Sequence, residues 1–299
     1  MRLVHSTTLC LIEFGEADIP PYAILSHRWG KDEISFQDMS CPNADRKAGY
    51  QKIKDFCRTA AEDGFEYVWV DTCCIDKTNS SELSEAINSM YRWYKDSEVC
   101  YAYLSDVDSG EDPHAPDSSF SRSRWFSRGW TLQELIAPSI VMFYGSGWKE
   151  IGTNSSLRDV IEAVTGIHAA AFLGDHKDLR YFSIAQRMSW AANRKTTRTE
   201  DLAYCLLGLF DISMPMLYGE GEGAFIRLQE EIIKVSDDPT IFAWRSNSVW
   251  DWNGGLLARS PSCFRNSRSI VRSDDSNTPS FALTNKGLRI QLPLYEFDK

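Results

Sequence analysis

The stretch Tyr22-Ala-Ile-Leu-Ser-His-Arg-Trp-Gly30 begins with a short apolar run and ends in polar residues and a glycine. An apolar run of this length, bounded by turn residues, predicts a buried strand over residues 22–26. Gly30 permits a sharp turn at the carboxyl end of that strand. Because ligands bind at this end of the strands in open α/β sheets, the stretch predicts both a strand and part of a site.

The first half of the chain continues as an alternation of strands and helices. Apolar runs predict strands over 67–70, 99–104 and 140–144, and repeated apolar faces predict helices over 47–62 and 80–95. Asn79 and Glu82 form a pair typical of a helix N-cap. This alternation indicates a parallel sheet with helices on both faces. Residues 1–19 are mixed in character, and we expect them to be peripheral.

The pattern changes after residue 150. Apolar stripes predict helices over 157–173, 183–192 and 202–210, and turn signals at Gly254-Gly255 and Asn285-Lys-Gly287 predict a β-rich end. We therefore divide the chain into an α/β core at 20–150, a helical extension at 151–240 and a β-rich segment at 241–299. That segment ends within a pattern, which is typical of a fragment of a longer protein.

Charge and cysteine usage exclude several classes of protein. A formal net charge of −10 argues against a general binder of nucleic acid or anionic membrane, because both need a positive field. Eight cysteines without a C-x-x-C pair, and an N-terminus without a signal-peptide core, indicate a reducing, cytoplasmic location. No run approaches the roughly 18 apolar residues of a membrane span. The five histidines show no metal-ligand spacing, so we expect no metal.

The stretch Trp125-Phe-Ser-Arg-Gly-Trp-Thr-Leu-Gln-Glu-Leu-Ile-Ala-Pro138 places one carboxylate in an apolar setting. Pro138 ends a short predicted helix. Trp130 and Glu134 are four residues apart and share one face of it, while two leucines are positioned to anchor it to a core. An acid beside an indole on an anchored helix is a candidate functional carboxylate. A surface glutamate on a packed helix remains the alternative.

Three other segments contain residue types that occur in binding sites. Arg28 and Gly30 are suited to an anion, because the guanidinium is a fork of donors and a glycine lets backbone approach. A strand-ending turn is the alternative there. Gly219-x-Gly221-x-Gly223 lacks the strand and spacing of a dinucleotide fingerprint, so we predict no such site. The segment 194–198, with three basic residues, is most simply a solvated face, with phosphate binding as the alternative.

Four blocks of the sequence resemble the signatures of the fungal heterokaryon incompatibility (HET) domain. They are Tyr22–Gly30, Tyr67–Lys77, Ser84–Tyr94 and Arg128–Pro138, and the likeness extends over roughly residues 20–245. It is a likeness to N-terminal HET modules of incompatibility proteins that continue into a NACHT nucleotide-binding oligomerisation domain and WD repeats. The resemblance implies a role in programmed cell death and fungal innate immunity, a longer protein, and self-association.

The HET domain is in turn similar to the TIR domain, a flavodoxin-like parallel sheet. Many TIR domains cleave NAD+ with a glutamate in a Trp-Cys-x-x-Glu-Leu motif. Trp130-Thr-Leu-Gln-Glu134-Leu matches that motif except for Thr131, which replaces the cysteine. The resemblance therefore implies that Glu134 is catalytic, that NAD+ or a related nucleotide is the substrate, and that no cofactor is needed.

The chemistry of NAD+ hydrolysis is compatible with one carboxylate. Nicotinamide leaves as a neutral base, so no general acid is needed, unlike in the two-carboxylate glycosidases. A single carboxylate can stabilise the oxocarbenium-like transition state. Substrate contacts are expected from Ser26, His27, Arg28, Trp29, Gly30, Asp71, Asp76 and Trp130. Two alternatives stay open: a non-enzymatic signalling module that kills by assembly or partner binding, and cyclisation or phosphodiester chemistry on another nucleotide.

Overall fold

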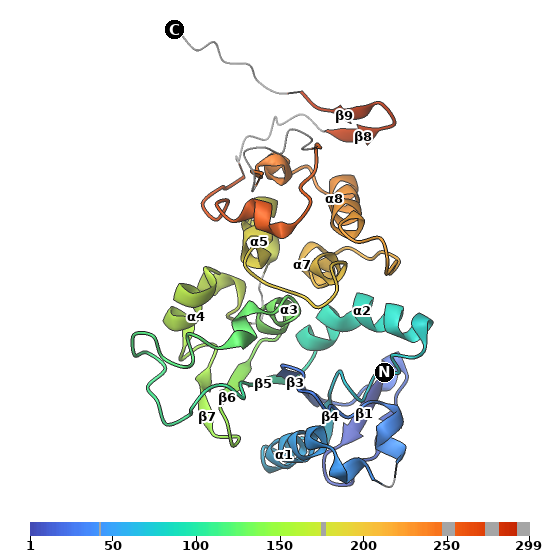
Figure 1. The fold of residues 1–299 in the computed structure, drawn as a ribbon, viewed down its shortest axis with the longest axis vertical. Coiled ribbons are helices and arrows are strands. Elements are labelled where there is room, and N and C mark those ends of the chain that lie inside the picture. Colours follow the sequence, from blue (N-terminus) through green and yellow to red (C-terminus); the bar gives the residue numbers. More distant parts are fainter. Residues whose placement is uncertain (42, 175–177, 247–254, 273–280, 292–299) are drawn as a thin grey trace. The chain divides into compact units, whose positions relative to one another are not determined.

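The structure is a computed structural model that describes residues 1–41, 43–174, 178–246, 255–272 and 281–291. The chain divides into two compact units, Met1–Asp178 and Leu179–Lys299. Figure 1 shows their elements in sequence colours.

The first unit is built on a seven-stranded sheet with the order β2-β1-β4-β3-β5-β6-β7. The strands are β1 (Arg2–His5), β2 (Leu11–Glu13), β3 (Tyr22–His27), β4 (Tyr67–Trp69), β5 (Val99–Tyr103), β6 (Val141–Tyr144) and β7 (Glu150–Thr153). Strands β4, β3, β5 and β6 are parallel neighbours, as predicted, and β3 lies buried between β4 and β5. Counted along the chain, these four have the order 2-1-3-4, with which flavodoxin-like sheets begin.

The two ends of the sheet differ from the prediction. Residues 1–19 are not peripheral, because β1 pairs antiparallel with β4 and the side chains of Leu3 and Val4 are completely buried. Strand β7, which was not predicted, pairs antiparallel with β6. Neither β1 (Arg-Leu-Val-His) nor β7 (Glu-Ile-Gly-Thr) contains an apolar run like those that predicted the central strands. The sheet is therefore parallel at its centre and antiparallel at both ends.

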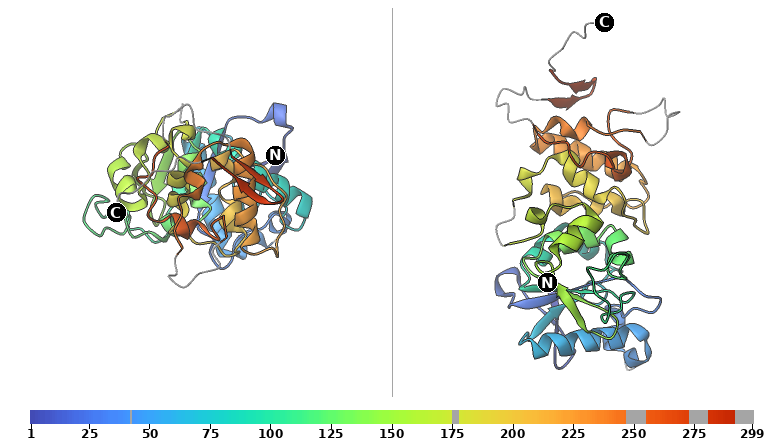
Figure 2. Two further views of the ribbon diagram at one scale, coloured as in Figure 1. Left: turned by 90° about the horizontal axis from the view of Figure 1, so that it is seen from above. Right: turned by 90° about the vertical axis from the view of Figure 1, so that its left-hand side faces the viewer.

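Helices cover both faces of this sheet, as predicted. The helices of the first unit are α1 (Ala48–Glu62), α2 (Ser80–Lys95), α3 (Thr131–Ile136) and α4 (Arg158–Thr165), with 3-10 turns η1 (Glu16–Asp18), η2 (Gln37–Ser40), η3 (Ala44–Arg46), η4 (Arg124–Ser127) and η5 (Ala169–Ala171). Helix α1 lies on one face, and α2 and α3 lie on the other (Figure 1). The right-hand view of Figure 2, in which α1 is blue, shows the same layers.

Local sequence signals explain the two long helices. The predicted apolar face of α1 (Ile53, Phe56, Cys57 and Ala60) is fully buried. The Asn79 side chain accepts hydrogen bonds from the backbone N–H groups of Ser81 and Glu82 at 3.1 and 3.3 Å, which confirms the predicted cap of α2. Residues 104–123 contain no helix or strand, in keeping with the long loop that separates β5 from η4.

The second unit is mainly helical. Its elements are η6 (Leu179–Tyr181), α5 (Ile184–Ala191), α6 (Asp201–Tyr204), α7 (Leu207–Phe210), α8 (Gly223–Val235), η7 (Pro239–Phe242), η8 (Pro261–Phe264), β8 (Ala282–Thr284) and β9 (Gly287–Arg289). The single helix predicted over 202–210 is in fact two short helices. A capping box of Ser183 and Gln186 starts α5.

The predicted β-rich end is only partly confirmed. Within the described part of 241–299, strands occur in one hairpin, β8–β9, whose turn contains the predicted Asn285-Lys286 pair, and the remaining regular elements are 3-10 turns. Gly254 of the other predicted turn lies outside the described residues. No helix among the described residues is both long and apolar enough to cross a membrane.

The burial of β1 predicts that the N-terminal strand contributes to stability. Replacing Leu3 by alanine removes a completely buried side chain and should lower the free energy of unfolding by about 2–5 kcal/mol. Leu11→Ala on the half-exposed strand β2 is the matched control and should cost less than about 1 kcal/mol. Urea unfolding followed by tryptophan fluorescence measures both. Equal effects of the two substitutions would contradict the pairing of β1 inside the sheet.

Candidate active site at the carboxyl edge of the sheet

Helix α3 is held against the carboxyl ends of the parallel strands. All six of its residues are buried, and the side chains of Leu132 and Leu135 are completely so, which confirms the predicted anchors. Glu134 lies on this helix and is only 7% exposed. A carboxylate that loses water to this extent needs polar partners within the protein.

Those partners come from β3 and from the 3-10 turn η4. The Ser26 hydroxyl donates a short hydrogen bond to Glu134 Oε2. The Ser26 Oγ atom accepts a hydrogen bond from the indole Nε1 of Trp125 at 2.8 Å. Trp125 was not singled out from the sequence, because nothing in its spacing links it to β3. Trp130 lies half-buried at the start of α3, one turn before Glu134.

Two buried neutral groups complete the surroundings of this carboxylate. Burial, and next the negative charge of Glu134, raise the pKa of the Tyr94 hydroxyl and of the Cys100 thiol well above their usual values. Both groups are therefore uncharged at neutral pH. Tyr94 donates its proton to the Leu25 carbonyl of β3 at 3.0 Å, which fixes its ring beside the strand.

A second cluster forms where β3 and β4 end. Asp71 follows β4 and accepts a hydrogen bond from the indole Nε1 of Trp29 at 2.8 Å. The His27 Nε2 atom lies 3.4 Å and the Lys77 ammonium 3.8 Å from the same carboxylate. The Lys77 ammonium also lies 3.8 Å from the centroid of the Trp29 ring, a cation–π contact. The predicted binding residues His27, Trp29 and Asp71 are thus brought together.

The charges of this cluster are set by burial and pairing. Burial alone would raise the pKa of Asp71, but the Lys77 charge, His27 and the Trp29 hydrogen bond outweigh it and hold that pKa below its usual range. Burial, and next the charge of Lys52, lower the pKa of His27, so its imidazole is neutral at pH 7. Lys77 is therefore the cation that balances Asp71.

Gly30 and Asp76 make contacts that shape loops. The Gly30 N–H donates a short hydrogen bond to Glu33, whose carboxylate also pairs with Lys52 at 2.5 Å. Asp76 Oδ1 accepts hydrogen bonds from Gln37 Nε2 at 2.7 Å and from the Thr78 hydroxyl at 2.6 Å.

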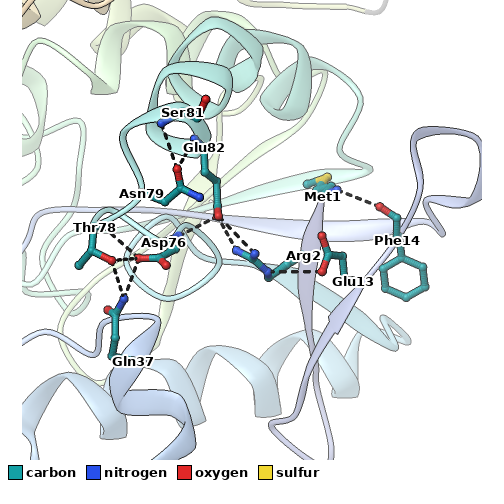
Figure 3. Close-up of polar contacts among 10 residues, drawn as sticks. All are labelled: Met1, Arg2, Glu13, Phe14, Gln37, Asp76, Thr78, Asn79, Ser81 and Glu82. Carbon is teal, nitrogen blue, oxygen red and sulfur yellow. Dashed lines mark hydrogen bonds and ion pairs between the residues drawn. The ribbon is translucent and has the colours of Figure 1, made fainter.

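Figure 3 shows that Asp76 belongs to a network at the start of α2. The Asp76 N–H donates to Glu82 at 2.8 Å, and Glu82 pairs with Arg2 of β1. In this structure the Asp76 carboxylate orders the loop before α2.

A group of basic side chains lies close to the end of β3. Burial first, and then the charges of Arg124 and Arg128, lower the pKa of Arg28. The buried Nε atom of Arg28 has no hydrogen-bond partner among the described residues. Arg124 pairs with Asp106 at 3.0 Å and keeps most of its side chain in solvent. The Asp106 carboxylate acts on Arg28 in the opposite direction, so the region holds three guanidinium groups and this one carboxylate.

The second unit corrects the prediction for one basic residue of the segment 194–198. Arg194 does not belong to a solvated face, because it is buried and its Nε donates to the Trp190 carbonyl at 3.2 Å. In the glycine-rich loop before α8, the N–H groups of Gly219 and Gly221 both donate to the Glu200 carboxylate, at 2.8 and 3.0 Å. An internal carboxylate therefore occupies the donors that a phosphate would need.

Comparisons with known proteins relate this chain to a family. The family model of the heterokaryon incompatibility protein (HET) matches residues 22–119, from the start of β3 into the loop before η4. The vegetative incompatibility protein HET-E-1 of Podospora anserina is 50% identical over 223 residues, which are 72% of this chain and 16% of that protein. No solved structure matches the chain. The likeness to a TIR domain therefore stays a prediction.

The Asp71 cluster predicts a pH dependence of stability. Because the pKa of Asp71 is lower in the folded than in the unfolded state, its contribution is present above the unfolded value of about 3.9 and is lost as the pH falls below it. Asp71→Asn should cost about 1–3 kcal/mol at pH 7 and progressively less between pH 4 and pH 2. Urea unfolding across that range provides the measurement.

Asp45→Asn is the matched control, since Asp45 is exposed. It should leave both the stability and its pH dependence close to those of the wild type. If Asp71→Asn retains the wild-type pH dependence, the charge of Asp71 is not held by Lys77 and Trp29 in solution.

Proposed function

The chain contains a heterokaryon incompatibility (HET) domain, and on that premise we propose that it is a cell-death effector of fungal incompatibility that hydrolyses NAD+ when it self-associates. The chain spans about a sixth of the incompatibility protein that it matches. The proposed trigger is self-association of the domain.

The observation that carries the proposal is the position of Glu134. It is a nearly buried carboxylate, hydrogen-bonded to the end of a central parallel strand, at the edge where open α/β sheets bind ligands. A fixed negative charge with few waters around it acts strongly on a positive charge that develops nearby.

The proposed reaction needs only NAD+ and water. The bond between ribose C1′ and the pyridinium nitrogen breaks, and its electron pair goes to that nitrogen, so that nicotinamide leaves uncharged. Water oxygen bonds to C1′ to give ADP-ribose, and one proton is released to the solvent. The Glu134 carboxylate stabilises the oxocarbenium character of C1′ while the bond breaks.

The phosphates and the aromatic rings of NAD+ have candidate partners among the residues that follow β3. The two phosphates carry one negative charge each, and Arg28, Arg124 and Arg128 outnumber the single carboxylate Asp106 in the region that would bind them. Trp29 is 45% exposed, while the contacts with Asp71 and Lys77 hold its ring in place. A fixed, exposed indole is a stacking surface for the nicotinamide or adenine ring.

A second candidate is a non-enzymatic module that kills by assembly or partner binding. The burial of Glu134 and its hydrogen bond to Ser26 favour it, because the same contact braces α3 against β3 without any chemistry. In that case Glu134 has a structural role, and its charge is not needed for killing.

Nicotinamide release distinguishes the candidates. The purified chain should release nicotinamide from NAD+ with a rate per molecule that rises steeply with protein concentration. Glu134→Gln keeps the shape and removes the charge, and should lower that rate at least about a hundredfold, as expected for a group that stabilises transition-state charge. Glu85→Gln, on the exposed face of α2, is the matched control and should retain wild-type activity. Chromatography of nicotinamide is the measurement.

Expression in fungal cells tests the second candidate with the same variants. If Glu134→Gln abolishes killing while oligomerisation is unchanged, the result supports catalysis. If Glu134→Gln still kills, and the folded and oligomeric wild type releases no nicotinamide, the protein acts as the assembly module instead.

The phosphate-binding role predicts an effect on KM. Arg28→Gln removes a guanidinium next to Arg124 and Arg128, and should raise KM for NAD+ by about tenfold or more. Arg122→Gln, at an exposed position of the preceding loop, should leave KM near the wild-type value. Steady-state kinetics of nicotinamide release measures both. An unchanged KM in Arg28→Gln would show that this guanidinium does not bind NAD+.

A further inference from the structure

The direction of the Ser26 hydroxyl proton is fixed by its two neighbours. An indole N–H can only donate, so the Ser26 oxygen must be the acceptor of the 2.8 Å hydrogen bond from Trp125. A serine hydroxyl carries one proton, and that proton points to Glu134 Oε2. The order Trp125 to Ser26 to Glu134 is therefore a chain of donors that ends on the carboxylate.

Trp125 is itself held rigidly. Its indole is completely buried and packs edge-to-face against Phe143 of β6, with ring centroids 5.7 Å apart. The backbone N–H of Trp125 donates to the Ser123 hydroxyl at 3.2 Å, and the Ser123 hydroxyl in turn donates to Asp106 at 2.8 Å. Both backbone and ring of Trp125 are thus fixed before any ligand binds.

A second contact joins Trp125 to the helix that carries Glu134. The Thr131 hydroxyl at the first position of α3 donates to the Trp125 carbonyl at 2.6 Å, and the Arg128 carbonyl is a more distant acceptor at 3.0 Å. Trp125 therefore contacts α3 through its carbonyl and the carboxylate of α3 through Ser26. The four residues Trp125, Ser26, Glu134 and Thr131 close a ring of contacts that spans η4, β3 and α3.

We propose that Trp125, Ser26 and Thr131 are positioning residues that hold the Glu134 carboxylate for the reaction. This inference rests on the proposed function. It changes the expected role of Ser26, because a hydroxyl whose proton is committed to Glu134 cannot donate it to the substrate. It also gives a role to Thr131, the residue that stands where the TIR motif has cysteine: its hydroxyl fastens α3 to η4.

Kinetics should separate positioning from substrate binding. A group that acts only through Glu134 affects the transition state rather than the bound substrate, so its loss lowers kcat and leaves KM nearly unchanged. Ser26→Ala and Trp125→Phe should lower kcat by about ten- to a hundredfold, with KM within about threefold of wild type. Thr131→Val, which keeps the side-chain shape, should lower kcat by about two- to tenfold. Trp93→Phe on half-buried Trp93 is the matched control and should change neither constant.

A measurement that does not depend on activity tests the contacts themselves. In ¹H–¹⁵N spectra of the full chain, Trp125→Phe identifies the Trp125 indole resonance by its disappearance. In the wild type this indole proton should exchange slowly with water. In Ser26→Ala it should shift upfield and exchange at least about tenfold faster, because its acceptor is gone, while the other indole signals stay in place.

Four outcomes overturn the inference: an unchanged Trp125 indole signal in Ser26→Ala, an unchanged kcat in folded Trp125→Phe, a rise in KM alone in Ser26→Ala, or no nicotinamide release by the wild type. The last outcome also ends the proposed function. The indole spectra separate a failure of the proposed function from a failure of the inference. They show whether Trp125, Ser26 and Glu134 form the chain of contacts even in a protein without activity.

Discussion

The first unit depends on how one buried carboxylate is compensated. Glu134 loses most of its water in the fold, and a charged group in that position is destabilising unless donors replace the solvent. Ser26 supplies a donor from β3, and Trp125 orients it from η4. The requirement couples β3 with two elements that lie far from it in sequence, η4 and α3. A change in any one of them would leave a buried polar atom without its partner, which costs more than the hydrogen bond itself contributes.

The topology of the sheet explains why these groups meet. Strands β3, β4 and β5 are parallel neighbours, so the residues after them lie at one edge of the sheet. Ser26 lies near the end of β3, and Trp29 comes after that strand. Asp71 comes after β4, and the long loop after β5 leads to η4 and α3. The antiparallel strands β1 and β7 extend the sheet sideways and add no group to the described site. The arrangement separates the elements that stabilise the fold from the edge that carries the polar side chains.

Much of this could be predicted from local patterns. The parallel strands, α1, α2 with its Asn79 cap, and the leucine anchors of α3 all follow from periodicity within single segments. Strands β1 and β7 could not be predicted, because their segments Arg-Leu-Val-His and Glu-Ile-Gly-Thr lack the apolar run that predicted the central strands. The role of Trp125 could not be predicted either. Its partner is 99 residues away, and only the crossover between β3 and η4 brings them together.

The charge distribution gives a physical reason for an anionic ligand at this edge. Arg28 is partly buried, and both burial and the charges of Arg124 and Arg128 disfavour its charge, while the Asp106 carboxylate favours it. A cluster of like charges is unfavourable unless anions balance it, and in the described residues Asp106 supplies a carboxylate to Arg124 while the buried Nε of Arg28 has no partner. A bound phosphate would satisfy Arg28 and relieve the repulsion at once. The region is thus better balanced with an anion than without one, which an overall charge of −10 alone would not suggest.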